Sequence, residues 1–357
     1  MKTEWVHKKL GDCLTIGNGC DYKHLQPGDV PVYGTGGVMT YVDKYLYDGE
    51  TVCVGRKGTI NHPIYHNGKI WTVDTLFYTH SFMNVLPKFI YYTFCNINWD
   101  KYNEATGVPS LSKDTINNIE IAVPPLSAQR RIAAILSSAD KVIASTQKLI
   151  AKYKQIKQGM MEELFNEQCT MNNVQWKKVR LGDIGKISMC KRVFSFETST
   201  EGGIPFYKIG TFGKTADAFI SRQLYEEYKS KFSYPKVGDI LISASGTIGR
   251  TVVYDGEPAY FQDSNIIWID NDEQIVLNQF LYYLYQTITW NLEGSTIARL
   301  YNDNFNKIEI SVPALTEQRR IAAILSGIDA KIAAEEKVLE KYEKVKKGLM
   351  ERLLEER

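Results

Sequence analysis

The chain repeats one segment of its own sequence almost unchanged. The nine residues 129–137 (QRRIAAILS) return at 318–326, a shift of 189 positions, and looser matches continue on both sides. For example, Gly58-Thr59-Ile60 resembles Gly246-Thr247-Ile248. A repeat of this kind predicts two copies of one structural plan. The chain therefore divides into a variable, a shared, a second variable and a second shared segment.

The shared segments have the pattern of long helices. Prolines stand just before each copy, and apolar residues then recur at alternating spacings of three and four, as in a coiled-coil seam. A helix with such a stripe is not stable alone in water, so each copy is expected to pack against the other. At about 1.5 Å per residue, such a helix spans ~60 Å and could act as a rigid spacer. The residues predicted to pack between the helices are Ile132, Ile135, Val142, Leu149, Tyr153, Ile156, Ile321, Ile324, Ile328, Val338, Tyr342 and Val345.

The variable segments have the pattern of mixed α+β domains. Short runs rich in β-branched and aromatic residues, such as 239–243, are bounded by Gly-rich turns, and aromatic stretches at 87–94 and 278–285 could be buried helices. The expected fold class is thus α+β, with two mixed α/β domains separated by two long helices packed as an antiparallel coiled coil, related by a pseudo-twofold repeat. The predicted boundaries are 1–123 and 172–311 for the mixed domains, and 124–168 and 312–357 for the helical segments.

Composition excludes several classes of protein. Lys and Arg number 43 against 41 Asp and Glu, so net charge gives no global reason to bind nucleic acid, although local basic patches remain possible. No apolar run approaches the ~18 residues of a membrane helix, and the N-terminus lacks a signal peptide, so a cytoplasmic location is expected. The six cysteines form no CxxC pair, which argues against a disulfide framework or a zinc site.

The sequence shows no convincing catalytic motif. It has neither a GxxxxGK[ST] phosphate loop nor a GxSxG nucleophile elbow. His62 and His66 have HxxxH spacing, but Pro63 argues against the helix that would bring them together, and no Glu follows His62. We therefore expect no catalytic residue and no metal site.

Polar, Gly-rich loops carry the remaining chemistry. Arg, Lys and Asn side chains can read base edges, and hydroxyls and backbone N–H groups can bind phosphates. The Gly-Thr-Ile triplet is also a good hairpin turn, and taken alone that explanation is the simpler one. The candidate DNA-contacting residues chosen from loop chemistry are Thr35, Arg56, Lys57, Asn61, Thr106, Lys208, Lys214, Ser245, Thr247, Arg250 and Arg299.

The whole chain resembles the DNA-specificity subunit of type I restriction-modification systems. The resemblance rests on a Val-Pro-x-Leu-x-x-Gln-x-x-Ile-x-x-Ile-Leu helix start, present twice, with Lys-x-Gly-x-Met-Glu-x-Leu near each helix end. It implies two target recognition domains, each reading one half of a bipartite, asymmetric site in double-stranded DNA. It also implies that the helices bind two methyltransferase subunits, to which restriction/translocase subunits are added. AdoMet, ATP and Mg²⁺ would belong to those partners, and this chain would bind no cofactor.

Two alternatives remain open at the level of sequence. The chain could be a coiled-coil scaffold for protein interactions without DNA specificity. It could also be the specificity module of a restriction enzyme whose catalytic portions lie elsewhere, although the absence of catalytic motifs favours a stand-alone subunit.

Overall fold

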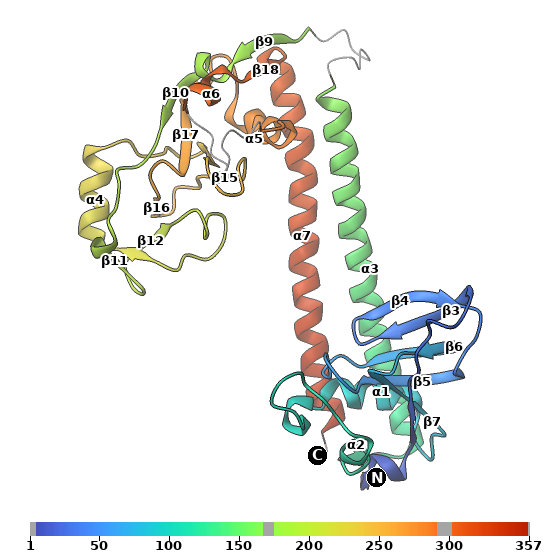
Figure 1. Cartoon of the computed structure of the whole chain (residues 1–357). Helices are drawn as coiled ribbons and strands as arrows, with labels where there is room; N and C mark the ends of the chain where they lie inside the picture. Colours follow the sequence, from blue (N-terminus) through green and yellow to red (C-terminus); the bar gives the residue numbers. More distant parts are fainter. Residues whose placement is uncertain (1–4, 167–174, 291–301, 356–357) are drawn as a thin grey trace. The chain divides into compact units, whose positions relative to one another are not determined.

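The structure is a computed structural model that describes residues 5–166, 175–290 and 302–355. Two compact units are seen (Figure 1): one runs over 1–149 with 335–357, the other over 150–334. Both boundaries fall inside long helices. The units therefore divide the chain differently from the four linear segments expected from sequence, because each variable segment packs with the start of one long helix and the end of the other.

A six-stranded sheet forms the centre of the first unit, in the order β2-β7-β5-β6-β3-β4. The β3–β6 pair is parallel and the other pairs are antiparallel. A separate two-stranded ladder joins β1 and β8. The strands are β1 (Val6–Lys9), β2 (Thr15–Asn18), β3 (Pro27–Gly34), β4 (Gly37–Val42), β5 (Tyr47–Gly55), β6 (Ile64–Thr72), β7 (Leu76–His80) and β8 (Glu120–Val123). The short helices are η1 (Leu10–Asp12), α1 (Pro87–Asn96), η2 (Trp99–Tyr102) and α2 (Lys113–Asn117).

The core of the first unit lies between α1 and β5. Pro87 starts α1, where its missing N–H leaves no helical hydrogen bond unmade. The helix buries Phe89 and Ile90 against Val52 and Val54 of β5. The aromatic stretch at 87–94 is therefore a buried helix, as the sequence suggested.

The second unit repeats this plan with one interruption. Its two four-stranded sheets have the orders β10-β17-β14-β15 and β11-β13-β12-β16. The β12–β16 pair is parallel, like β3–β6, and β14 pairs with β15 as β5 pairs with β6. The long β6 of the first unit thus corresponds to two short strands, β15 and β16, with residues 254–259 between them. The strands are β9 (Lys177–Arg180), β10 (Gly185–Ser188), β11 (Thr198–Ser199), β12 (Ile204–Tyr207), β13 (Phe219–Ile220), β14 (Ile240–Ser243), β15 (Thr251–Val253), β16 (Tyr260–Phe261), β17 (Ile266–Asn271) and β18 (Glu309–Val312). The short helices are η3 (Leu181–Asp183), η4 (Ser195–Glu197), α4 (Arg222–Lys231), α5 (Asn278–Thr287) and α6 (Asn302–Lys307).

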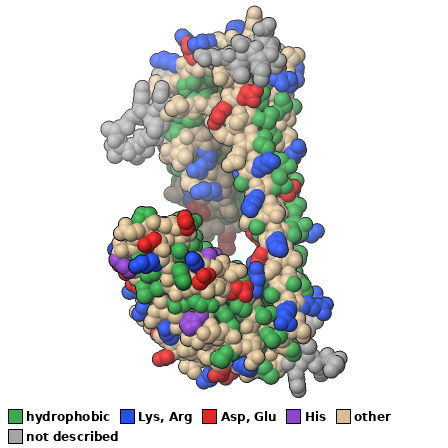
Figure 2. All heavy atoms as spheres, turned by 90° about the vertical axis from the view of Figure 1, so that its right-hand side faces the viewer, with side chains coloured by type: hydrophobic (Ala, Val, Ile, Leu, Met, Phe, Trp, Pro, Cys, Tyr) green, Lys and Arg blue, Asp and Glu red, His purple; other side chains and the backbone are tan. Residues whose placement is uncertain are grey.

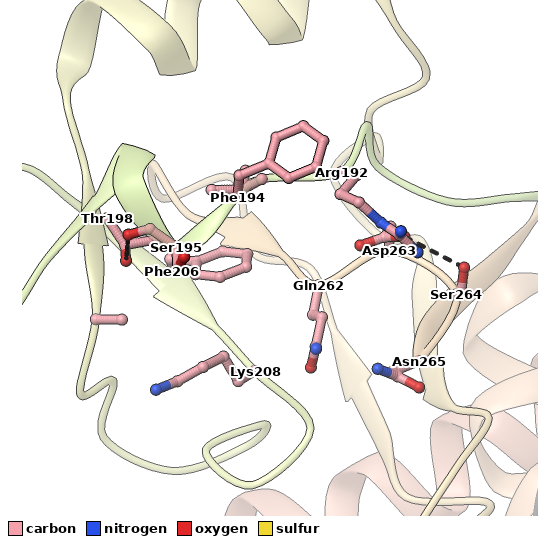
Figure 3. A pocket seen from close by; sticks show the side chains of 12 residues that line it. Arg192, Phe194, Ser195, Thr198, Phe206, Lys208, Gln262, Asp263, Ser264 and Asn265 are labelled. Carbon is pink, nitrogen blue, oxygen red and sulfur yellow. Dashed lines mark hydrogen bonds and ion pairs between the residues drawn. The ribbon is translucent and has the colours of Figure 1, made fainter.

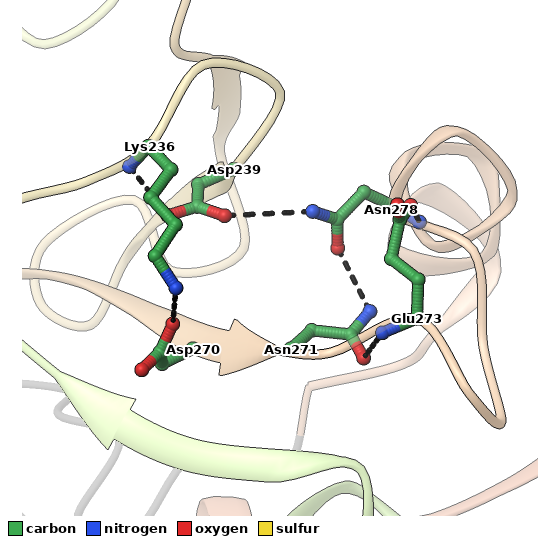
Figure 4. A network of polar contacts seen from close by, with 6 residues as sticks. All are labelled: Lys236, Asp239, Asp270, Asn271, Glu273 and Asn278. Atoms are coloured by element: carbon green, nitrogen blue, oxygen red, sulfur yellow. Dashed lines mark hydrogen bonds and ion pairs between the residues drawn. The ribbon is translucent and has the colours of Figure 1, made fainter.

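A polar network holds the start of β14 against the end of β17 and the start of α5 (Figure 4). Asp239, which is almost fully buried, accepts a hydrogen bond from the Lys236 backbone N–H at 2.7 Å. Asn271 donates to Asn278 Oδ1 at 2.9 Å, and Lys236 forms an ion pair with Asp270 at 2.7 Å. Burial raises the pKa of Asp239 above its ordinary value.

The long helices α3 (Leu126–Leu164) and α7 (Leu315–Leu354) pack together in opposite directions within each unit. In the first unit, Asp140 of α3 pairs with Lys346 of α7 at 2.5 Å. In the second unit, Lys157 of α3 pairs with Asp329 of α7 at 2.7 Å. Asp329 and Lys346 lie 189 positions after Asp140 and Lys157, so the two ion pairs are repeat equivalents with exchanged helices. This confirms the antiparallel helices and the pseudo-twofold repeat.

The buried positions along these helices differ from the predicted heptad seam. The prediction was wrong for five side chains that are exposed: Val142, Ile156, Val338, Tyr342 and Val345. Among the other predicted positions, Ile132 and Ile321 are buried, and Ile135, Leu149, Tyr153, Ile324 and Ile328 are partly buried. Other buried side chains along these helices, outside the predicted seam, include Leu136, Ile150, Met161 and Leu325. The physical reason is that a straight α-helix drifts by about 20° per heptad from a strict 3.5-residue repeat. Over helices this long, strict heptad positions rotate out of the contact face.

Among the residues that the structure describes, no helix is long and apolar enough to cross a membrane. Figure 2 shows hydrophobic side chains lying between lysines and arginines on the visible surface of the long helices.

Candidate nucleic-acid interface

Three loops of the first unit meet around Gly58. The Gly58 backbone N–H donates to the Pro109 carbonyl at 2.8 Å, and Lys57 forms a β-bridge with Ser110. A Cβ atom at Gly58 would lie 3.7 Å from Thr35 Oγ1, so the turn between β3 and β4 also approaches this loop. The structure therefore brings Thr35 and Lys57 together beside the loop that carries Thr106.

The cations and hydroxyls of these loops differ in how firmly they are held. Arg56 contacts the Asp74 carbonyl at 3.4 Å and lies 5.8 Å from the centre of the Phe77 ring. Lys57 and Thr106 are exposed, and so is Asn61, farther along the loop after β5. Their polar groups are free to meet a ligand from solution, whereas Arg56 is partly committed to its own fold.

Loops of the second unit also converge. Arg250 donates to the Phe212 carbonyl at 2.9 Å, which ties the loop after β14 to the loop after β12. Lys208, on that second loop, forms an ion pair with Asp217 at 2.8 Å, between two partly exposed side chains. Lys214 and Thr247 are exposed. The structure thus groups four of the predicted residues of this unit.

Two predictions in the second unit need correction or lie beyond the structure. Ser245 is only 8% exposed, and its hydroxyl donates to Asn265 Oδ1 at 2.7 Å. It braces the neighbouring turn, and the burial that follows from this contact makes it unsuited to bind DNA directly. Arg299 lies outside the described residues.

A common backbone frame underlies the loops of both units. The Arg56 N–H donates to the Thr75 carbonyl at 2.8 Å, and the Ala244 N–H donates to the Asn265 carbonyl at 2.8 Å. One strand away, the Val73 N–H donates to the Tyr33 carbonyl at 3.0 Å, and the Gln262 N–H donates to the Tyr207 carbonyl at 2.9 Å. The hydrogen bonds that hold the two frames therefore match, while the side chains that they present are different.

The turn at 262–265 was missed by the choice of candidate residues. It consists of Gln262, Asp263, Ser264 and Asn265, which separate the apolar strands β16 and β17. Four polar residues between two apolar runs are the signal that could have identified it. This turn lines a pocket of about 470 Å³ together with residues of the segments 192–198 and 206–208, and with Ala218 (Figure 3).

The glutamine of each shared motif bonds the start of the long helix to the rest of its unit. Gln129 is fully buried; its Oε1 accepts from the Leu86 N–H at 2.8 Å and its Nε2 donates to the Asn84 and Pro124 carbonyls. Gln318 makes the equivalent set of bonds, with Leu277 as the donor at 2.8 Å. The motif is therefore a structural anchor.

A tyrosine from α1 in the first unit, and one from α5 in the second, joins the ion pair on the long helices. Tyr92 donates to Asp140 Oδ2 at 2.6 Å, and Tyr283 donates to Asp329 Oδ2 at 2.8 Å. Burial, and then the bond to the carboxylate, raise the pKa of each phenol, so both hydroxyls stay protonated and act as donors. The two units are thus fastened to the helices by the same chemistry.

The thiols of Cys53 and Cys190 are poor nucleophiles. Burial raises the pKa of each to about 12, so both are neutral at physiological pH. No group of three potential metal ligands occurs within the described ranges. The chemistry that the loops offer is hydrogen bonding and charge, which suits binding.

Comparisons with known proteins agree with this architecture. The sequence profile described as "Type I restriction modification DNA specificity domain" matches residues 2–155 and 173–344. A candidate type I restriction enzyme specificity subunit of Haemophilus influenzae is 42% identical over 319 residues, covering 85% of this chain and 80% of that protein. The Type I restriction enzyme MjaVIII specificity subunit of Methanocaldococcus jannaschii is 31% identical over 280 residues, covering 70% of this chain and 65% of that protein.

Solved structures show the same fold. The S subunit of a type I restriction-modification system from M. genitalium aligns with a TM-score of 0.70 at 16% identity, covering 99% of this chain and 97% of that one. A chain from a study of assembly and conformational transition in the type I restriction-modification system aligns with a TM-score of 0.58 at 17% identity, covering 99% of both chains. With two profile matches that span most of its length, this chain belongs to the type I restriction-modification DNA specificity family.

Proposed function

We propose that each unit of this specificity subunit reads one half of a bipartite, asymmetric site in double-stranded DNA. The observation that carries the proposal is the pair of matching backbone frames with different side chains. Two domains related by a pseudo-twofold operation present their loops in equivalent ways, and unlike loops select unlike half-sites. In this proposal the long helices set the spacing between the half-sites.

The same helices dock two methyltransferase subunits in this proposal. Ile156 and Val345 are repeat equivalents, and both are exposed although they are large and apolar. Exposed apolar side chains at symmetry-related places are suited to bind two copies of one partner. Restriction/translocase subunits join this core, and AdoMet, ATP and Mg²⁺ are used by the partners in the cytoplasm.

Methylation mapping tests the central proposal. The chain would be co-expressed with its methyltransferase subunit, and methylated adenines would be located across the host DNA by single-molecule sequencing. We expect a two-part asymmetric motif that disappears when this chain is omitted. If a folded, bound methyltransferase produces no motif that depends on this chain, the proposal is wrong and the scaffold alternative gains support.

A charge reversal assigns a half-site to the first unit. Lys57→Glu should weaken methylation, because an exposed cation in the loop cluster becomes an anion facing DNA. Lys44→Glu is the matched control, since Lys44 is exposed in the turn before β5, at the opposite end of that strand from Lys57. Equal methylation in both variants would remove Lys57 from the interface.

Subunit stoichiometry tests the docking surfaces. Ile156→Glu and Val345→Glu should each lose one methyltransferase subunit in native mass spectrometry, and the double variant should lose both. Lys152→Glu and Lys341→Glu are the controls, because these residues are exposed repeat equivalents on the same helices. Retention of both subunits in the double variant would place the docking surface elsewhere.

A further inference from the structure

The pocket at the 262–265 turn presents hydrogen-bond donors. Gln262 Oε1 accepts from the Ile209 N–H at 2.9 Å, and Asn265 Oδ1 accepts from the Ser245 hydroxyl at 2.7 Å. Both amide oxygens are therefore engaged inside the protein. Within the described part of the chain, the amide NH₂ groups of Gln262 and Asn265 make no hydrogen bond. Figure 3 shows these two amides next to each other on one side of the pocket.

The charges around the pocket favour an electron-rich ligand. Asp263 is the one carboxylate among the lining residues, and Arg192 neutralises it through an ion pair of 2.9 Å. Lys208 supplies a further cation at the wall. Its partner Asp217 is largely exposed, and such surface pairs are weak enough to exchange for a ligand contact. The pocket thus combines paired amide donors with a positive wall.

The backbone of the turn is strained in a way that fixes the amides. Ser264 has φ of +60°, a left-handed conformation that residues other than glycine seldom adopt. The bonds from Ala244 to the Asn265 carbonyl and from Ile209 to Gln262 hold this shape. Strain of this kind is retained where the surrounding structure over-determines it, often at binding sites.

An aromatic pair flanks the pocket on the surface. The rings of Phe194 and Phe196 stack with centroids 5.6 Å apart, and Phe196 is 83% exposed. Phe194 also lines the pocket. Stacked rings exposed beside a cationic, donor-rich hollow are suited to contact with nucleic acid.

We propose that Gln262 and Asn265 form a base-reading subsite of the second unit, selective for guanine. Guanine presents two neighbouring acceptors, N7 and O6, in the major groove, whereas adenine presents one acceptor and one donor, and cytosine presents a donor. Two adjacent NH₂ donors fit the guanine edge best. This inference rests on the proposed function. It adds that the half-site read by the second unit contains a guanine at one position.

Isosteric variants test the subsite without removing its internal bonds. Gln262→Glu and Asn265→Asp keep the oxygens that accept from Ile209 and Ser245, but they replace each NH₂ donor with an acceptor oxygen. The methylated motif of each variant would be mapped in the full complex. We expect tenfold to hundredfold less methylation of sites with guanine at one position of one half-site, a range typical of lost base contacts. Gln274→Glu is the control, because it makes the same change on an exposed loop outside the pocket.

The outcomes separate this inference from the proposed function. A wild-type complex without any motif that depends on this chain would reject the proposed function. A wild-type motif whose affected half-site contains only A·T pairs would overturn the guanine subsite. Uniform loss of methylation at all sites, with the base preferences unchanged, would show phosphate contact and would also overturn it. Methylation of both variants equal to that of Gln274→Glu would overturn it as well.

Discussion

The two recognition units share their anchors and differ in their sheets and loops. In the first unit β6 is one strand of nine residues, whereas its counterpart in the second unit is divided into β15 and β16. Yet both units keep the same backbone bonds beneath the loops and the same glutamine, tyrosine and aspartate contacts to the long helices. The comparison shows that both units attach to the long helices through the same contacts, although the loops that the two units present are different.

Removal of the anchor glutamines should have the largest effect, and the same effect in both units. Gln129→Ala and Gln318→Ala each leave a partly buried N–H and two carbonyls without their side-chain partner. We expect a loss of about 3 kcal/mol in the free energy of unfolding of the affected unit. Urea unfolding followed by hydrogen exchange would locate the loss, at α1 for Gln129→Ala and at α5 for Gln318→Ala. A large loss in one unit and none in the other would break the equivalence.

Alanine substitution of glycines at equivalent turns should destabilise the two units by different amounts. Gly58 has φ of +97° and Gly246 has φ of +64°, and a Cβ at either position would meet only ordinary contacts. The cost of alanine is therefore mostly backbone strain. We expect about 2 kcal/mol for Gly58→Ala and about 1 kcal/mol for Gly246→Ala, because φ near +60° lies inside the left-handed region. Urea unfolding of each variant measures the two costs. A larger cost for Gly246→Ala than for Gly58→Ala would contradict this explanation.

The helix carboxylates should contribute less to stability than the anchor glutamines, since these carboxylates are partly exposed. Asp140→Asn and Asp329→Asn each weaken an ion pair and a tyrosine hydrogen bond, and we expect a cost of about 1–2 kcal/mol in each unit. Double-mutant cycles with Lys346→Met and Lys157→Met measure the coupling energy of each pair. Coupling in only one cycle would show that the two ion pairs are equivalent in sequence but not in energy.

The smallest expected difference between the two units is in how their stability depends on pH. Asp239, which directly precedes β14, occupies the place of the buried Thr51 of β5 in the first unit, and burial raises the pKa of Asp239. A carboxyl with a raised folded pKa binds more protons in the folded state, so stability falls as the pH rises from the ordinary value through the folded one. Asp239→Asn should flatten this slope in the second unit, as measured by urea unfolding between about pH 3.5 and 6. A slope unchanged by the variant would contradict this assignment.

The exposure of several candidate residues could be predicted from sequence, and the reasons for the failures are physical. Lys57, Thr106, Lys214 and Thr247 lie on exposed loops, as their glycine-rich surroundings predicted. Ser245 lies in the same kind of glycine-rich loop, but its hydroxyl donates to Asn265, 20 positions later in the sequence, and the serine is buried. The turn at 262–265 lines its pocket together with the segments 192–198 and 206–208, which are distant from it in the sequence. Sequence alone does not show that these segments lie close together.

The repeat at 189 positions determined by itself that the chain has two related halves, each combining a mixed α/β segment with a long helix. It did so because periodic apolar residues and repeated motifs are local properties that survive without knowledge of contacts. Only the tertiary structure decided which helix faces are buried, that Gln129 and Gln318 are anchors, and that the Gln262 and Asn265 amides present their donors to a common pocket. Those features depend on partners distant in sequence and on the drift of a straight helix away from a strict heptad, which no local pattern records.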